Sequence, residues 1–203
     1  MEKLLGRDVT RRQALGLLGI GGAAAMMPRA FAQELTFPKG AIIRTVLKDY
    51  APEELAGGAT LFHEHLQLAR DFNQKFAAAS AAVRAANGLP PAPARGGGRG
   101  GNRGGTPPPD IMHNADLMAE EVDKAKAAGI ACIVDAGHPD SGRDINFLRE
   151  VSMKSGMPIV AGGGYYTQPW YPPELASMSE DQVFRALIKQ ADDDTLGAWG
   201  EIG

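Results

Sequence analysis

Residues 125–144 read AKAAGIACIVDAGHPDSGRD and residues 150–166 read EVSMKSGMPIVAGGGYY, and these two stretches decide the fold. Each joins the end of a helix-forming segment to a short apolar strand, with a glycine, Gly129 or Gly156, where the helix should stop. Strands and helices alternate with short connections, so an α/β fold with a parallel sheet covered by helices is expected. The helices are predicted over 114–128, 143–155 and 180–191, and the strands over 130–136, 158–162 and 196–202.

Two architectures satisfy this alternation: a (β/α) barrel and an open doubly wound sheet. No GxGxxG or GxxxxGK[ST] motif follows a strand, which disfavours a nucleotide-binding sheet. Upstream, the pattern predicts strands over 41–47 and 59–66 and an alanine-rich helix over 69–87.

Residues 88–109, GLPPAPARGGGRGGNRGGTPPP, interrupt this pattern and consist mostly of glycine and proline. Such a segment cannot bury enough apolar surface to offset its ordering entropy, so a disordered surface insertion is predicted. Its arginines, Arg95, Arg99 and Arg103, are typical of RGG-type RNA-binding tracts. They lack aromatic partners, so no nucleic-acid partner is expected, and an RNA-binding module is kept only as a weak alternative.

The chain has 203 residues, 44% of them hydrophobic, and a formal net charge of −3, which excludes wholesale disorder and argues against a dedicated nucleic-acid binder. Its single cysteine excludes a disulfide scaffold and a thiolate-clustered metal site. Residues 1–32 contain Arg11 and Arg12, a charge-free run too short to span a bilayer, and the small-residue pattern Ala30-Phe31-Ala32. These features predict a Tat-like signal peptide and a periplasmic or secreted product with no membrane span. A Sec signal and a short N-terminal helix are the alternatives.

His63 and His65 flank Glu64 at the end of the strand predicted over 59–66. Side chains two residues apart on a strand lie on the same face, so the two imidazoles are placed to bind one divalent metal ion. Glu201 lies between glycines in the last predicted strand, where burying a carboxylate is costly unless it is paired or binds metal. The alternatives are ordinary core or surface histidines and a glutamate exposed at a strand end.

The segments GATLFHEHL (58–66) and GEIG (200–203), together with the two stretches quoted first, resemble the phosphotriesterase family of the amidohydrolase superfamily, including its lactonase branch. The resemblance covers most of residues 41–203 apart from the insertion. It implies an α/β fold consisting of the first half, strands one to four, of a (β/α)8 TIM barrel. By this resemblance His63 and His65 match two metal-binding histidines, and Glu201 matches the catalytic residue that bridges two metal ions.

The implied chemistry is hydrolysis of a small-molecule lactone, ester or phosphotriester. The resemblance implies two divalent metal ions, expected to be zinc, and a metal-bridging hydroxide as the attacking group. The family's remaining ligands, two histidines and an aspartate on later strands, have no counterpart here, so a fragment that is inactive by itself is expected. A naturally short, non-catalytic or oligomer-forming protein is the alternative. A homodimer is considered for the full-length product.

Aromatic residues follow the strand predicted over 158–162. Tyr165, Tyr166 and Trp170 are interpreted as lining a substrate pocket, with simple packing as the alternative. The resemblance places further residues in the loop after the strand 130–136, and these are interpreted as structural: Asp135, Gly142, Arg143 and Asp144.

Overall fold

The structure is a computed structural model that describes residues 36–92 and 109–200. The predicted signal peptide, most of the predicted insertion and Glu201 lie outside these described residues. All the helices and strands discussed below belong to one compact unit, Phe37–Gly203. Within the described residues, no helix combines the length and the apolar character needed to span a bilayer.

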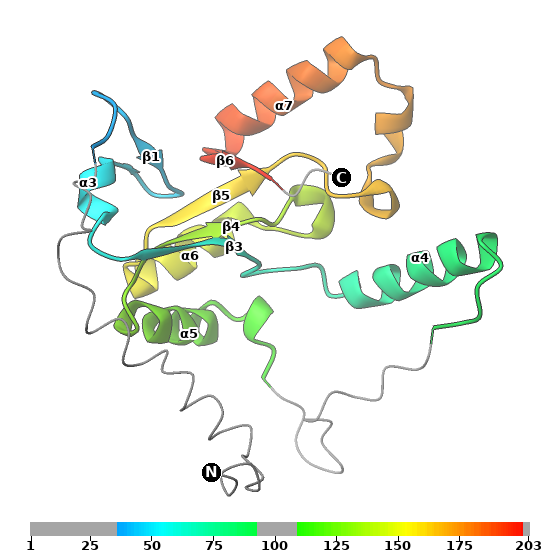
Figure 1. Cartoon of the computed structure of the whole chain (residues 1–203), viewed down its shortest axis with the longest axis horizontal. Coiled ribbons are helices and arrows are strands. Elements are labelled where there is room, and N and C mark those ends of the chain that lie inside the picture. The colour runs from blue at the N-terminus through cyan, green and yellow to red at the C-terminus, as the bar shows by residue number, and fades with distance from the viewer. Residues whose placement is uncertain (1–35, 93–108, 201–203) are drawn as a thin grey trace, which may run out of the picture. The chain divides into compact units, whose positions relative to one another are not determined.

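The main sheet contains four parallel strands that pair in chain order (Figure 1). They are β3 (Ala59–Glu64), β4 (Ile130–Asp135), β5 (Ile159–Gly163) and β6 (Ala198–Trp199). A doubly wound sheet would reverse its strand order at a switch point, whereas this order runs without reversal.

Three helices pack on the same face of this sheet: α5 (Ala115–Ala127), α6 (Ile145–Ser155) and α7 (Glu180–Asp194). A single apolar cluster joins Val122 of α5 and Leu148 of α6 to Ile133 and Ile159 of the sheet, and Ala191 of α7 packs against it. A doubly wound sheet would carry helices on both faces. The arrangement is therefore that of strands one to four of a (β/α)8 TIM barrel, which confirms the predicted fold class.

The opposite face of the sheet carries a smaller apolar cluster. It contains Cys132 and Val160 from the strands and Leu55 from the short helix α3 (Pro52–Leu55). A two-stranded antiparallel hairpin, β1 (Ile43–Arg44) and β2 (Asp49–Tyr50), packs against this cluster through Ile43 and Tyr50. The segment that precedes β3 thus covers the part of this face around Cys132 and Val160.

The hairpin corrects the prediction of a single strand over 41–47. The turn forms because Thr45 donates hydrogen bonds to the Lys48 carbonyl oxygen from both its backbone N–H (3.2 Å) and its hydroxyl (2.6 Å). Just beyond Thr45, the Val46 N–H donates to the Ile159 carbonyl oxygen at 2.8 Å. A local turn and one backbone contact that is distant in sequence therefore interrupt a segment whose composition favours a strand.

The remaining boundaries agree with the predictions to within a few residues, except that the predicted end of the strand over 196–202 lies outside the described residues. Helix α5 begins after Asn114, whose side chain accepts hydrogen bonds from the N–H groups of Asp116 and Leu117. Gly129 and Gly156 follow α5 and α6 with positive φ angles of 96° and 63°, a conformation in which glycine has no Cβ penalty. The helix predicted over 69–87 is α4 (Phe72–Ala86), and none of its residues is buried.

Candidate functional site

His63 is a residue of β3, and His65 stands one residue beyond that strand. Their ring centroids lie 5.6 Å apart with an angle of 79° between the ring planes. His63 is exposed and His65 is half-buried. The structure therefore brings together the two histidines of the predicted metal site.

A register shift in β3 decides which face of the sheet these histidines occupy. Leu61 pairs with Ile133, but Glu64 pairs with Asp135, so β3 contains one extra residue in between. Leu61 and Ile133 both contact the core under the helices. Paired residues of neighbouring strands share a face and successive residues alternate, so Glu64 falls on the helix-covered face and both histidines fall on the opposite one. Simple alternation from Leu61 would have turned them toward the helices.

Asp135, the last residue of β4, is completely buried. Its Oδ2 atom accepts a hydrogen bond from the Leu66 N–H at 2.7 Å, and its Oδ1 atom accepts one from the Gly137 N–H at 3.0 Å. Burial raises the pKa of the Asp135 carboxyl, while these two N–H groups and the nearby His65 and Arg143 act in the opposite direction.

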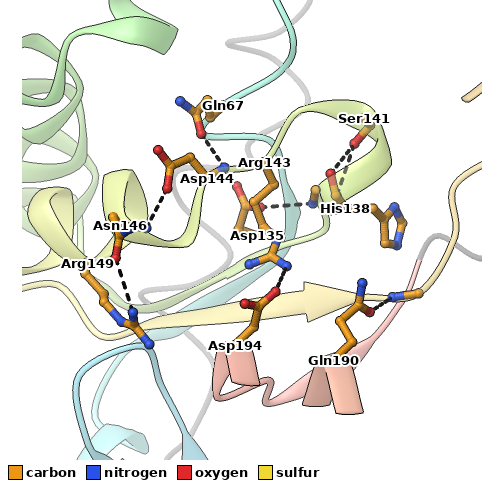
Figure 2. Close-up of polar contacts among 12 residues, drawn as sticks. Gln67, Asp135, His138, Ser141, Arg143, Asp144, Asn146, Arg149, Gln190 and Asp194 are labelled. Carbon is orange, nitrogen blue, oxygen red and sulfur yellow. Dashed lines mark hydrogen bonds and ion pairs between the residues drawn. The ribbon is translucent and has the colours of Figure 1, made fainter. Parts of the chain in front are cut away.

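Arg143 links this region to α7. Its Nη2 atom donates to Asp194 Oδ2 at 2.7 Å, and its side chain is only 1% exposed (Figure 2). Asp194 is the last residue of α7. The partly buried ion pair therefore fixes the loop after β4 to the end of α7, which agrees with the structural interpretation of Arg143.

His138 lies at the same edge of the sheet, three residues after the end of β4, and is fully buried. Its Nε2 atom contacts the carbonyl oxygen of Gly200, just past β6, and its ring stacks on Tyr166 with centroids 6.0 Å apart. A carbonyl oxygen only accepts, so Nε2 is the donor. Sequence reasoning did not place His138 in the site. Its position in the loop after a parallel strand was the available signal, because ligands bind at the carboxyl ends of such strands.

The three predicted pocket residues lie in an aromatic cluster. Trp170 is buried and stacks on Phe72 of α4, with ring centroids 4.9 Å apart. Tyr166 meets Trp170 edge to face at 5.2 Å, whereas Tyr165 contacts Tyr171 instead at 6.3 Å. These contacts agree with the packing alternative for Trp170, and the substrate-binding role of the three residues stays a prediction.

An open surface hollow of about 570 Å³ is formed by residues of the segment 168–176, and none of the three predicted pocket residues lines it. It is lined by Gln168, Tyr171, Pro172, Pro173, Leu175 and Ala176.

The imidazoles of His63 and His65 are the ligand type expected for the metal that the sequence implies. Zinc takes imidazole nitrogens at about 2.0–2.1 Å, and two rings 5.6 Å apart on one face can reach a single ion. Within residues 36–92 and 109–200, no three His, Cys, Asp or Glu side chains gather closely enough to hold an ion. Glu201, the predicted third ligand, lies outside those ranges. The two histidines thus fit a metal as part of a ligand set, and the assignment of Glu201 stays a prediction.

Residues 43–198 match the model of the phosphotriesterase family. The chain belongs to that family. The match includes β3 with its histidine, the loop after β4, and the aromatic segment after β5. The resemblance inferred from the sequence is therefore confirmed.

Two curated relatives and one solved structure show how far the similarity extends. The N-acetyltaurine hydrolase of Rattus norvegicus is 27% identical over 169 residues, which is 79% of this chain and 47% of that protein. The N-acetyltaurine hydrolase of Xenopus tropicalis is 28% identical over 99 residues, which is 46% of this chain and 28% of that protein. The crystal structure of a resiniferatoxin-binding protein from Rhodobacter sphaeroides is 28% identical with a TM-score of 0.51, covering 80% of this chain and 45% of that one. The chain spans less than half the length of these curated relatives.

Proposed function

We propose that this chain supplies part of the active site of a metal-dependent hydrolase that acts on a small molecule. The observation that carries the proposal is the pair of imidazoles, His63 and His65, held 5.6 Å apart on the sheet face opposite the helices. Membership in the phosphotriesterase family supports it. Glu201 is proposed as a further ligand and catalytic residue on sequence grounds alone.

His63 and His65 bind the metal in this proposal. When bound, divalent ions, proposed to be two zinc ions, supply Lewis acidity and activate water for attack on the substrate. The chain's own contribution is positional: β3 and its register shift orient the two histidines on one side of the sheet. The candidate substrates are lactones, esters and phosphotriesters. The curated relatives named for N-acetyltaurine hydrolysis add an N-acetyl amide to this set.

Metal binding by the purified full chain tests the centre directly. The protein is dialysed against zinc, and its bound metal is measured by elemental analysis for the wild type, His63→Ala and His65→Ala. We expect bound zinc in the wild type and at least about a tenfold weaker affinity in each variant, since each removes one of few ligands. His113→Ala is the matched control, because His113 contacts Asp110 and Leu68 instead of the histidine pair. Undiminished zinc in the double variant His63→Ala/His65→Ala would contradict the proposal.

Hydrolysis of a lactone, an aryl ester, a phosphotriester and an N-acetyl amide tests the reaction. We expect negligible turnover by this chain alone. Turnover that needs zinc and falls in His63→Ala would overturn that expectation and would identify the substrate class. Turnover that survives both zinc removal and the His63→Ala substitution would show that another site performs the reaction.

A further inference from the structure

Asp135 is a fully buried carboxylate that is not one of the proposed metal ligands. Burying a charged carboxylate without compensation is costly, so its presence needs a physical reason. Each of its oxygens accepts one backbone N–H, from Leu66 at 2.7 Å and from Gly137 at 3.0 Å. The two N–H groups belong to segments that are 71 positions apart in the numbering but meet at this one side chain.

The contact with Leu66 lies where β3 leaves the sheet. The last ladder pair is Glu64 with Asp135, and the Glu64 carbonyl oxygen accepts the Ala136 N–H at 2.8 Å. Two residues beyond Glu64, the Leu66 N–H donates to the Asp135 side chain instead of to the backbone of β4. The backbone is thus held on both sides of His65, at the Glu64 carbonyl and at the Leu66 amide.

We propose that Asp135 is a positioning residue that holds the His63–His65 pair in place for metal binding. The metal half of this inference rests on the function proposed above. The second half is the backbone clamp, by which we mean the two hydrogen bonds that the Asp135 carboxylate accepts from the N–H groups of Leu66 and Gly137. It rests on these contacts alone.

The chemistry of the contact requires a carboxylate. Two N–H donors converge on Asp135, and only a group with two acceptor oxygens satisfies both. An asparagine would turn an NH₂ group toward one of these donors. The nearby guanidinium of Arg143 offsets the negative charge and is itself held by Asp194.

Gly137 keeps space open beside the carboxylate. A Cβ atom placed on Gly137 would lie 2.7 Å from Asp135 Oδ1, closer than such atoms approach in real structures. The Gly137→Ala substitution would therefore displace the carboxylate without changing any charge. It provides a second, independent way to disturb the clamp.

The experiment compares the full chain as wild type, Asp135→Asn and Gly137→Ala. Amide hydrogen exchange at Leu66 is measured in metal-free protein, and zinc affinity is measured by competition with a chromophoric chelator. Zinc affinity is expressed per folded molecule, with the folded fraction taken from circular dichroism. Asp144→Asn is the matched control, because the Asp144 side chain caps α6 by accepting the Asn146 N–H at 2.8 Å, whereas the Leu66 N–H donates to Asp135.

We expect Leu66 exchange to accelerate at least about tenfold in Asp135→Asn, and zinc affinity to fall about 10- to 100-fold, as when groups that orient metal ligands are replaced. Gly137→Ala should shift both quantities in the same direction. Unchanged Leu66 exchange in both variants would overturn the clamp. A lower folded fraction with an unchanged zinc affinity per folded molecule would overturn the positioning role and leave a structural one. If the wild type binds no zinc, the proposed function and the metal half of this inference fail together, while Leu66 exchange still decides the clamp.

Discussion

A single histidine, His113, ties the start of the segment after β3 to the residues that lead into α5. Its Nδ1 atom contacts Asp110 Oδ1 at 2.7 Å, and its Nε2 atom contacts the Leu68 carbonyl oxygen at 2.8 Å. Arg70 makes an ion pair with the same carboxylate. Both partners of the ring are oxygen atoms, so the two ring nitrogens join Asp110 to the Leu68 carbonyl. These contacts hold together the two ends of the long connection between β3 and α5.

The stability that these contacts contribute depends on pH, because it depends on the charge of Asp110. The hydrogen bond from His113 lowers the pKa of the Asp110 carboxyl below its ordinary 3.8, burial opposes this shift, and Arg70 adds to it. A folded-state pKa below the unfolded value stabilises the fold at pH values above the ordinary pKa. The contribution is lost as the pH falls through the lowered one. We therefore expect Asp110→Asn to unfold at a lower urea concentration than the wild type near neutral pH.

That difference should shrink as the pH falls through the acid range below the ordinary pKa. Urea midpoints measured for both proteins at about pH 7 and about pH 3 check this. Asp123→Asn on the exposed surface of α5 is the control for removing one acidic residue. A gap between the Asp110→Asn and wild-type midpoints that is equally large at both pH values would speak against the ionic contact.

Among the secondary-structure elements, β6 is short and depends on a contact from outside the sheet. The Gly200 N–H donates to the Gly163 carbonyl oxygen of β5 at 3.3 Å, and the Gly200 carbonyl oxygen accepts from His138. We expect His138→Ala to speed amide exchange at Gly200 and to cost about 1 kcal/mol of unfolding free energy, since a partly buried carbonyl loses its donor.

His138→Gln places an amide donor near the position of Nε2 and should restore part of the protection at Gly200. Exchange at Leu66, which is held by Asp135, serves as an internal control in the same spectra. Equal exchange at Gly200 in the wild type and His138→Ala would remove His138 from the support of β6.

The elements that the sequence predicted well are those set by local chemistry. Helices α5 and α6 end at Gly129 and Gly156 because a positive φ there suits glycine, and that signal is visible in the chain itself. The register shift of β3 was not visible, because it depends on pairing with β4 some 70 residues away. The contact of His138 with Gly200 spans 62 positions and was hidden for the same reason.

In the candidate site, too, some features follow from local sequence and others from tertiary contacts. The spacing of His63 and His65 was enough to predict two imidazoles on one face, since the period of a strand is local. Which face they occupy, and what holds them there, required the neighbouring strand and its Asp135 carboxylate. Sequence patterns thus predicted the shared face of the two imidazoles, whereas the contacts around them come from tertiary structure.

At the scale of the whole molecule, the four strands and the helices on one face agree with membership in the phosphotriesterase family over residues 43–198. Residues 1–32, which the sequence predicts to be a signal peptide, lie outside this matched region. We propose that this leader exports the protein by the Tat route, which carries folded proteins. Export of a folded chain would allow a metal to be bound before the membrane is crossed, in keeping with the centre proposed at His63 and His65.

Replacing the twin arginines by lysines separates the Tat route from the Sec route, because the substitution keeps the positive charge. A Sec signal needs only a basic segment before its apolar run, whereas a Tat signal requires the arginine pair itself. We therefore expect Arg11→Lys/Arg12→Lys to move the full chain from the periplasmic to the cytoplasmic fraction, as measured by fractionation and immunoblotting of a bacterial host. Arg7→Lys, which changes an arginine outside the pair, should leave export intact. Normal export of the twin-lysine protein would assign the leader to the Sec route instead. Retention of both the wild type and the variant in the cytoplasm would deny residues 1–32 any role as a signal.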